Sequence, residues 1–287
     1  MNLSNLGTLA LSPPQSPEAW LATQPSWRFD FAGGDLVLIQ PSSTLIVYAL
    51  GILTIAMGLR FLGLRRRAAA LAGASGTATA RALLCWGIAL VVWGLGTLLA
   101  GTSYQAFGYM IKGSGRATMA LTSYWEVAYM MLTVASVSSM GVAVAAFSTR
   151  GLGGKFLGAW AWISTPAYLA FALVGAAKPD AFMVSFEAMV LFVIPSMLGF
   201  FAVNLLAWLR WKRRADLILL RAWLGMALVM AAYFAAYLGG LGPALWSRGL
   251  WFSENDVLHL GLVAWMLYLG FRLAPALLRS GGEAALA

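Results

Sequence analysis

Four ionisable side chains lie within, or at the start of, long apolar stretches of the sequence. They are Glu126, Glu187, Asp256 and His259. An ionisable group inside a bilayer is energetically costly, so it usually has a partner or a function there. Carboxylates attract cations, and an imidazole changes its charge near neutral pH. These residue types predict a site for a small polar or cationic ligand.

Two of the carboxylates also fit the starts of helices. The segment from Ser123 to Glu126 has the spacing of a capping box, in which each side chain bonds to the other residue's backbone N–H. Ser253 and Asp256 have the same spacing, and acids are favoured in a first helical turn. His259 follows Asp256 by three residues, where a carboxylate partner would make it a proton switch. The sequence leaves both interpretations open, a ligand site and a set of helix caps.

Glu187 has no such explanation in the sequence. We expect its helix to begin after Pro179 and Asp180, with Asp180 as the cap. Glu187 then lies two turns into the helix, roughly 10 Å along the axis. A carboxylate at that depth must face protein, water or a ligand rather than lipid. The structural alternative is a protonated side chain that bonds to a neighbouring helix.

Tyrosines gather near the same ends of the apolar stretches as these acids. Six of the nine do so: Tyr104, Tyr109, Tyr124, Tyr129, Tyr233 and Tyr237. Some fit an aromatic belt at the headgroup level, but Tyr129 and Tyr233 are expected to lie deeper. Acids beside tyrosines can form a cage for a cation. The predicted ligand-binding set is therefore Glu126, Tyr129, Glu187, Tyr233, Tyr237, Asp256 and His259.

Residues 102–116 form a connection rich in glycine, tyrosine and basic side chains. We expect it to fold over the mouth of this site as a lid. Lys112 or Arg116 would then pair with Glu126 or Glu187.

Two other functions remain open. Glu126, Glu187, Asp256 and His259 could bind a metal ion if their helices converged, which would suit an intramembrane hydrolase of a lipid-like substrate. The chain could also be a non-catalytic scaffold subunit with membrane-protein partners. His259 is the single histidine and Cys85 the single cysteine, which excludes multi-histidine zinc sites, bis-histidine haem and intrachain disulfides. We assign no cofactor, no resident metal and no nucleic-acid partner from the sequence.

The composition of the chain predicts that these side chains are held by membrane-spanning helices. The 287 residues are 61% hydrophobic and only 10% charged, which leaves too little polar surface for a water-soluble globule. A helix needs about 20 apolar residues to cross a bilayer. Seven stretches qualify, at residues 43–64, 83–104, 121–147, 156–176, 181–208, 217–238 and 256–277. We expect an all-α membrane protein, a seven-transmembrane-helix bundle over residues 43–278.

Charge predicts the orientation of this bundle. Of the 19 Lys and Arg residues, five fall on the N-terminal side of the membrane and the other 14 on the opposite side. The five are Arg28, Lys112, Arg116, Lys178 and Arg248. Basic loops stay in the cytoplasm, so the N-terminus is expected outside and the C-terminus inside, in a bacterial-type inner membrane. The net charge of +9 is thus a topology signal, although the basic clusters 65–67 and 210–214 could also bind anionic lipid headgroups.

The two ends of the chain lie outside the bundle in this interpretation. Residues 1–42 are an extracytoplasmic tail with a short interfacial helix over 17–23, started by Ser16, Pro17 and Glu18. Its aromatic side chains would hold it at the membrane interface. Residues 279–287 are a cytoplasmic tail.

Overall fold

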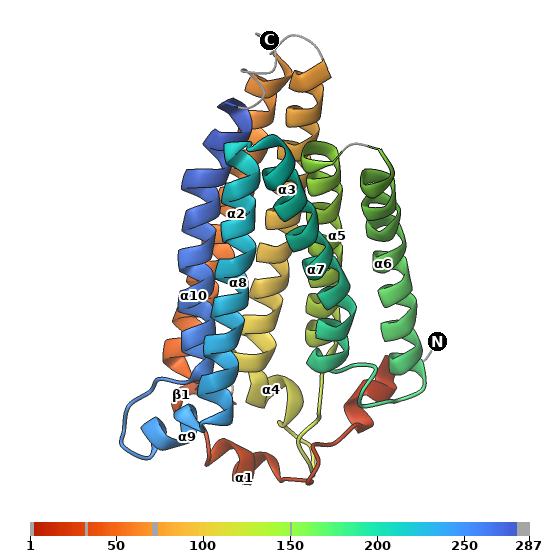
Figure 1. Cartoon of the computed structure of the whole chain (residues 1–287). Helices are drawn as coiled ribbons and strands as arrows, with labels where there is room; N and C mark the ends of the chain where they lie inside the picture. Colours follow the sequence, from red (N-terminus) through yellow and green to blue (C-terminus); the bar gives the residue numbers. More distant parts are fainter. Residues whose placement is uncertain (1–2, 32–33, 71–73, 150, 280–287) are drawn as a thin grey trace.

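A computed structural model describes residues 3–31, 34–70, 74–149 and 151–279 of the chain. Within them, seven helices are long and apolar enough to cross a membrane (Figure 1). They cover Pro41–Ala69, Thr77–Ala106, Tyr124–Ser148, Leu152–Ala177, Phe186–Trp211, Arg214–Leu238 and Glu254–Arg279. The predicted all-α membrane protein with seven spans is confirmed, and each predicted span falls on one of these helices. The predicted C-terminal tail lies outside the described residues, apart from residue 279.

Five of the spans are single α-helices: α2 (Pro41–Ala69), α5 (Tyr124–Ser148), α6 (Leu152–Ala177), α7 (Phe186–Trp211) and α8 (Arg214–Leu238). The other two are α3 (Ala74–Ala100) and α10 (Glu254–Tyr268), and each runs on into a π-helical turn, η2 (Gly101–Ala106) or η3 (Leu269–Leu273). Short elements join or precede them: η1 (Leu3–Thr8), α1 (Pro17–Leu21), β1 (Ser26–Phe31), β2 (Gly34–Ile39), α4 (Gly108–Lys112) and α9 (Leu241–Trp246).

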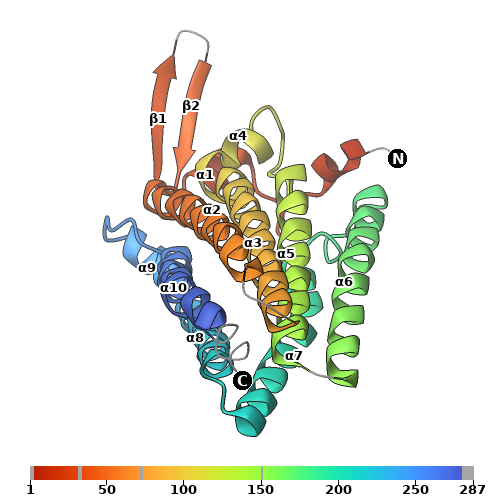
Figure 2. The ribbon, with the colours of Figure 1, turned by 90° about the horizontal axis from the view of Figure 1, so that it is seen from above.

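The helices form two groups around α3 and α10. α3 packs between α2 and α5, and α5 also contacts α6 and α7. α10 packs against α2 and α8, while α7 and α8 contact each other (Figure 2). The N-terminal segment, α4 and α9 gather at one end of the bundle, which we call the tail end (Figure 1). The opposite end carries basic residues on α2 (65–67), on α6 (Lys155) and around the turn between α7 and α8 (210–214), and we call it the basic end.

The closest helix contact joins α2 and α3 through paired glycines. A Cβ at Gly58 would lie 2.9 Å from the backbone oxygen of Gly87, and one at Gly94 would lie 2.8 Å from that of Gly51. Any side chain at these positions would therefore push the two backbones apart. Small residues allow this approach in a membrane, where helices associate by packing rather than by escape from water.

Indole rings fill the middle of the bundle. Trp86 of α3 stacks on Trp223 of α8 with ring centroids 5.8 Å apart, and Trp93 of α3 meets Trp265 of α10 at 5.4 Å. Trp265 also donates its indole N–H to the carbonyl of Ala222, at 2.7 Å. These contacts tie the α8–α10 pair to α3.

The N-terminal segment is more structured than predicted. The expected short helix is present as α1, with the Ser16 hydroxyl accepting from the N–H of Ala19 at 3.1 Å. The sequence analysis missed the antiparallel hairpin β1–β2, in which Trp27 pairs with Leu38 and Phe29 with Leu36. The hairpin projects away from the bundle (Figure 2). Its strands are short and its aromatic residues can serve an interface as well as a strand, so composition alone did not distinguish the two.

The N-terminal segment also covers the connection between α4 and α5. Ala10 forms a β-bridge with Ala120, and the N–H of Leu11 donates to the carbonyl of Met119 at 3.0 Å. The buried side chain of Leu6 packs with residues of α5, α6 and α7. Residues 3–31 and 34–40 are therefore part of the tail-end structure.

The glycine contact generates a test within one helix. We expect Gly58→Ala to destabilise the protein by about 1–3 kcal/mol, the cost of overpacking a tight contact. A Cβ at Gly63, on the same helix, would meet nothing within 4 Å, so Gly63→Ala should leave stability unchanged or raised. Thermal unfolding of both variants in detergent measures the difference. Equal melting temperatures for the two variants would contradict the close approach of α2 and α3.

Candidate functional site

Glu126 is fully buried at the tail end of the bundle, one turn into α5. The Ser123 hydroxyl caps this helix, accepting from the N–H of Glu126 at 3.3 Å. The carboxylate of Glu126 points elsewhere: its Oε1 lies 2.7 Å from Nζ of Lys112 and accepts from the Ser103 hydroxyl at 3.0 Å. The helix-start interpretation is thus correct for Ser123, while the carboxylate itself joins α5 to η2 and α4.

The predicted pairing of the 102–116 connection with a buried acid is confirmed for Lys112. Its ammonium lies between the Glu126 carboxylate and the ring of Tyr104, 5.0 Å from the ring centroid. Arg116 does not reach either acid, because its guanidinium donates to the carbonyl of Gly7. Within the described chain, Lys112–Glu126 and Arg213–Asp216 are the two ion pairs.

Tyrosines surround the buried ion pair. Tyr104 and Tyr129 meet edge to face with ring centroids 6.0 Å apart. Tyr129 lies within electrostatic range of Tyr168 and Tyr233, and Tyr233 stacks on Tyr237 at 6.1 Å. Tyr237 is 57% exposed, so the row of rings runs from the interior to the surface.

Several polar atoms in this group lack a protein partner. Oε2 of Glu126 and the hydroxyl of Tyr168 are buried without a hydrogen bond to any described residue. The hydroxyls of Tyr104, Tyr129 and Tyr233 likewise form none with the described part of the chain. Buried polar groups are nearly always satisfied, so Oε2 of Glu126 and the Tyr168 hydroxyl mark a place where water or a ligand can bind.

Glu187 is not where the sequence analysis placed it. Residues 181–184 form turns, and α7 begins at Phe186 with Ser185 as its cap. Asp180 accepts from the N–H of Met183 at 2.9 Å and so stabilises a turn instead of the helix. Glu187 is therefore an exposed residue of the first turn, where the helix dipole favours it. Its charge still lies within electrostatic range of Tyr104 and Tyr233.

Asp256 and His259 lie in a separate contact. Asp256 completes the capping box of α10 with Ser253 and accepts from the Ser43 hydroxyl of α2 at 2.9 Å. His259 is buried, and its Nδ1 has no partner among the described residues. No hydrogen bond joins it to Asp256. The expected Asp256–His259 pair does not form, because the carboxylate is used by the two serines.

The possible metal site drawn from the same acids does not assemble. Within the described residues, no group of three or more His, Cys, Asp or Glu side chains lies close enough to hold a metal ion. The sequence could not show this, because convergence depends on the order in which the helices pack.

A second buried polar network, at the basic end, was missed. Asp216 of α8 accepts from Nε of Arg213 at 2.7 Å and lies 3.4 Å from the amide nitrogen of Asn204 in α7. The Asn204 amide also bonds to Ser148 of α5 and to the indole N–H of Trp223. A lone asparagine in the apolar run 198–209 was the available signal. These bonds join α5, α7 and α8, although Nη2 of Arg213 is buried without a partner among the described residues.

Comparison with known protein families, with curated protein sequences and with solved structures finds no match for this chain. Function therefore has to be argued from the site itself. The tail-end group combines the Lys112–Glu126 ion pair, in which Oε2 of Glu126 has no partner, with the exposed carboxylate of Glu187 and several tyrosine hydroxyls without partners among the described residues. Such a set can bind a polar molecule.

The buried ion pair generates a double-mutant test. Glu126→Gln should cost about 3–5 kcal/mol of stability, because it leaves the Lys112 ammonium buried and unpaired. Lys112→Met should be similarly costly. The double variant should recover a large part of the loss, since no charge is then left without a partner. Melting temperatures of the unaltered protein, the two single variants and the double variant in detergent give the coupling between Lys112 and Glu126. Strictly additive effects of the two substitutions would contradict the pairing.

Proposed function

We propose that the protein is a receptor or transporter that binds a small polar or cationic ligand among the tyrosines at the tail end. The chain is a polytopic membrane protein with seven apolar helices. The observation that carries the proposal is the set of polar atoms without partners. Glu126 Oε2 supplies an acceptor, and the hydroxyls of Tyr104, Tyr129 and Tyr233 supply donors and acceptors around it.

Charge favours a cation over an anion at this position. Lys112 neutralises Glu126, whereas the negative charges of Glu254 and Glu187 lie within electrostatic range of Tyr233, and that of Glu187 also within range of Tyr104. Aromatic faces add to the attraction of a cation. Tyr237 is exposed next to Tyr233 and would line the approach from the surface. A ligand with an ammonium group and a hydrogen-bond donor would satisfy the whole set.

Tetramethylammonium chloride is a suitable first probe for this site. We expect the purified protein to bind it, as seen by saturation-transfer NMR in detergent, and to bind the neutral isostere tert-butanol much more weakly. Glu187→Gln should weaken binding about tenfold, equivalent to roughly 1.4 kcal/mol. Tyr129→Phe removes the hydroxyl and keeps the ring. A ligand that hydrogen-bonds to this hydroxyl should lose affinity in the variant, whereas tetramethylammonium, which forms no hydrogen bond, should not.

Glu18→Gln is the matched control, because Glu18 is an exposed acid at the same end of the bundle and belongs to α1. It should bind the probe as the unaltered protein does. Equal weakening by Glu18→Gln and Glu187→Gln would reduce the effect to general surface charge. Equal binding of tert-butanol and tetramethylammonium would contradict a cation site.

The scaffold interpretation has one observation in its favour. The face of α8 that carries Ala227, Ala231 and Ala235 is exposed, and small residues at this spacing allow another helix to pack closely. A scaffold subunit would copurify with a membrane partner in mild detergent. Ala231→Leu should then release the partner without lowering affinity for tetramethylammonium.

The orientation with the N-terminus outside, in a bacterial-type inner membrane, is part of the proposal. In a Cys85→Ser background, a membrane-impermeant maleimide applied to intact bacteria should label Ser114→Cys at the tail end. It should label Arg66→Cys at the basic end only after the cells are opened. Both side chains are exposed in the bundle, so accessibility to reagent depends on the membrane alone. The reverse labelling pattern would overturn the orientation and, with it, the outward-facing site.

A further inference from the structure

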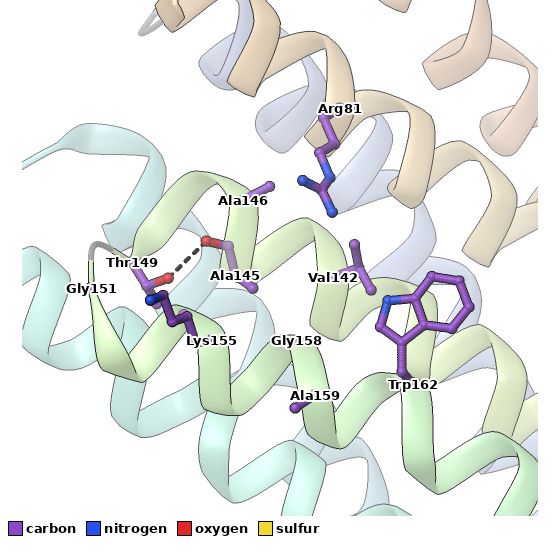
Figure 3. Close-up of a pocket in the computed structure, with 11 residues that line it drawn as sticks. Arg81, Val142, Ala145, Ala146, Thr149, Gly151, Lys155, Gly158, Ala159 and Trp162 are labelled. Carbon is purple, nitrogen blue, oxygen red and sulfur yellow. Dashed lines mark hydrogen bonds between the residues drawn. The ribbon is translucent and has the colours of Figure 1, made fainter.

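A groove of about 500 Å³ lies at the basic end, where α3, α5 and α6 meet. Arg81 reaches it from α3, while Lys155 and Trp162 line it from α6 (Figure 3). Figure 3 shows the Arg81 guanidinium and the Trp162 indole pointing toward one another, with Lys155 farther along the groove beside Thr149. The groove opens on the outside of the bundle, at the end where a lipid headgroup would be.

The groove carries two cations without counterions. Its lining includes Arg81 and Lys155 but no carboxylate. Both side chains are exposed, and neither takes part in the two ion pairs of the described chain. Positive charges placed on a shared apolar surface attract one negative ligand more strongly than charges spread over a loop.

The shape of the groove comes from small residues on α6. Gly151, Gly154 and Gly158 line it, and Ala145 of α5 lies on the facing helix. A Cβ at Gly158 would meet nothing within 4 Å, so the space beside it is open. A larger residue at this position would fill the groove without a clash.

The remaining lining suits the apolar part of a lipid. Trp162 is 75% exposed and lies about one turn beyond Gly158. An exposed indole is typical of the membrane interface, where its ring contacts acyl chains and its N–H faces the headgroups. Val142 and Ala159 extend the same apolar surface. A free phosphate ion would use the two cations and leave this surface unused.

We propose that this groove is a binding site for an anionic phospholipid, with the phosphate between Arg81 and Lys155 and the glycerol and acyl region against Trp162. The site lies at the opposite end of the bundle from the ligand cluster and stands independently of it. The groove recognises two features of the lipid: a phosphodiester with net negative charge and the apolar chain joined to it.

Native mass spectrometry of the protein in mild detergent tests the proposal. Dioleoyl phosphatidylglycerol should remain bound at concentrations where dioleoyl phosphatidylcholine is lost. Arg81→Gln with Lys155→Gln should lower the affinity for phosphatidylglycerol about 30-fold, because each basic residue near an anionic headgroup contributes about fivefold. Both side chains are exposed without partners, so we expect this variant to fold.

Two further variants separate the groove from general charge. Arg272→Gln with Arg279→Gln removes the same charge from exposed positions at the basic end that do not line the groove. This pair should change the affinity for phosphatidylglycerol less than about twofold, which is the effect of general charge alone. Gly158→Leu keeps both cations but fills the groove, and should lose the lipid. Equal loss in both arginine-containing pairs, or retention by Gly158→Leu, would overturn the site. Equal stabilisation of the protein by inorganic phosphate and by phosphatidylglycerol would show an ion site and overturn the lipid assignment.

Discussion

The backbone approach of α2 and α3 is the constraint on which the rest of the bundle depends. Gly58 lies against Gly87, and Gly51 against Gly94, so the two backbones approach closely at two levels and side chains of the facing helix fill the space over each glycine. Inside a bilayer the hydrophobic effect does not hold helices together, and close packing has to do so. α2 then carries α10 on its other side, and α3 carries α5. A change in the α2–α3 spacing would move both groups of helices, and with them the tyrosines of the tail end.

Two ion pairs with buried carboxylates lie at opposite ends of the bundle. Lys112–Glu126 joins α4 and α5 at the tail end, and Arg213–Asp216 lies with Asn204 where α5, α7 and α8 meet. Their surroundings differ in a way that matters for function. Asp216 has protein partners on both oxygens, whereas Oε2 of Glu126 has none among the described residues. Of the two carboxylates, that of Glu126 is therefore the one with an oxygen left for another molecule.

The sequence predicted the spans because span length and apolar composition are set by the bilayer alone. It also predicted the caps at Ser123 and Ser253, since capping depends on residues three positions apart. It misplaced Glu187, because a turn over residues 181–184 can use the same Asp180 that would start a helix. It expected Asp256 and His259 to pair from their spacing on one helix, but the Ser43 hydroxyl of α2 competes for that carboxylate. Contacts within a turn could be derived, while contacts between distant helices required their packing order.

Four tryptophans in the middle of the bundle limit how a ligand at the tail end could act. Trp223 and Trp265 of the α8–α10 pair contact Trp86 and Trp93 of α3, so an apolar layer lies between the tyrosine cluster and the basic end. A polar ligand cannot cross that layer while the rings remain in contact, because desolvation there would be uncompensated. Transport would therefore require the α8–α10 pair to move away from α3. Sensing would require only that ligand binding beside Tyr233 of α8 shifts the same pair. In the proposed function, transport and sensing would both act on the contacts of Trp86 with Trp223 and of Trp93 with Trp265.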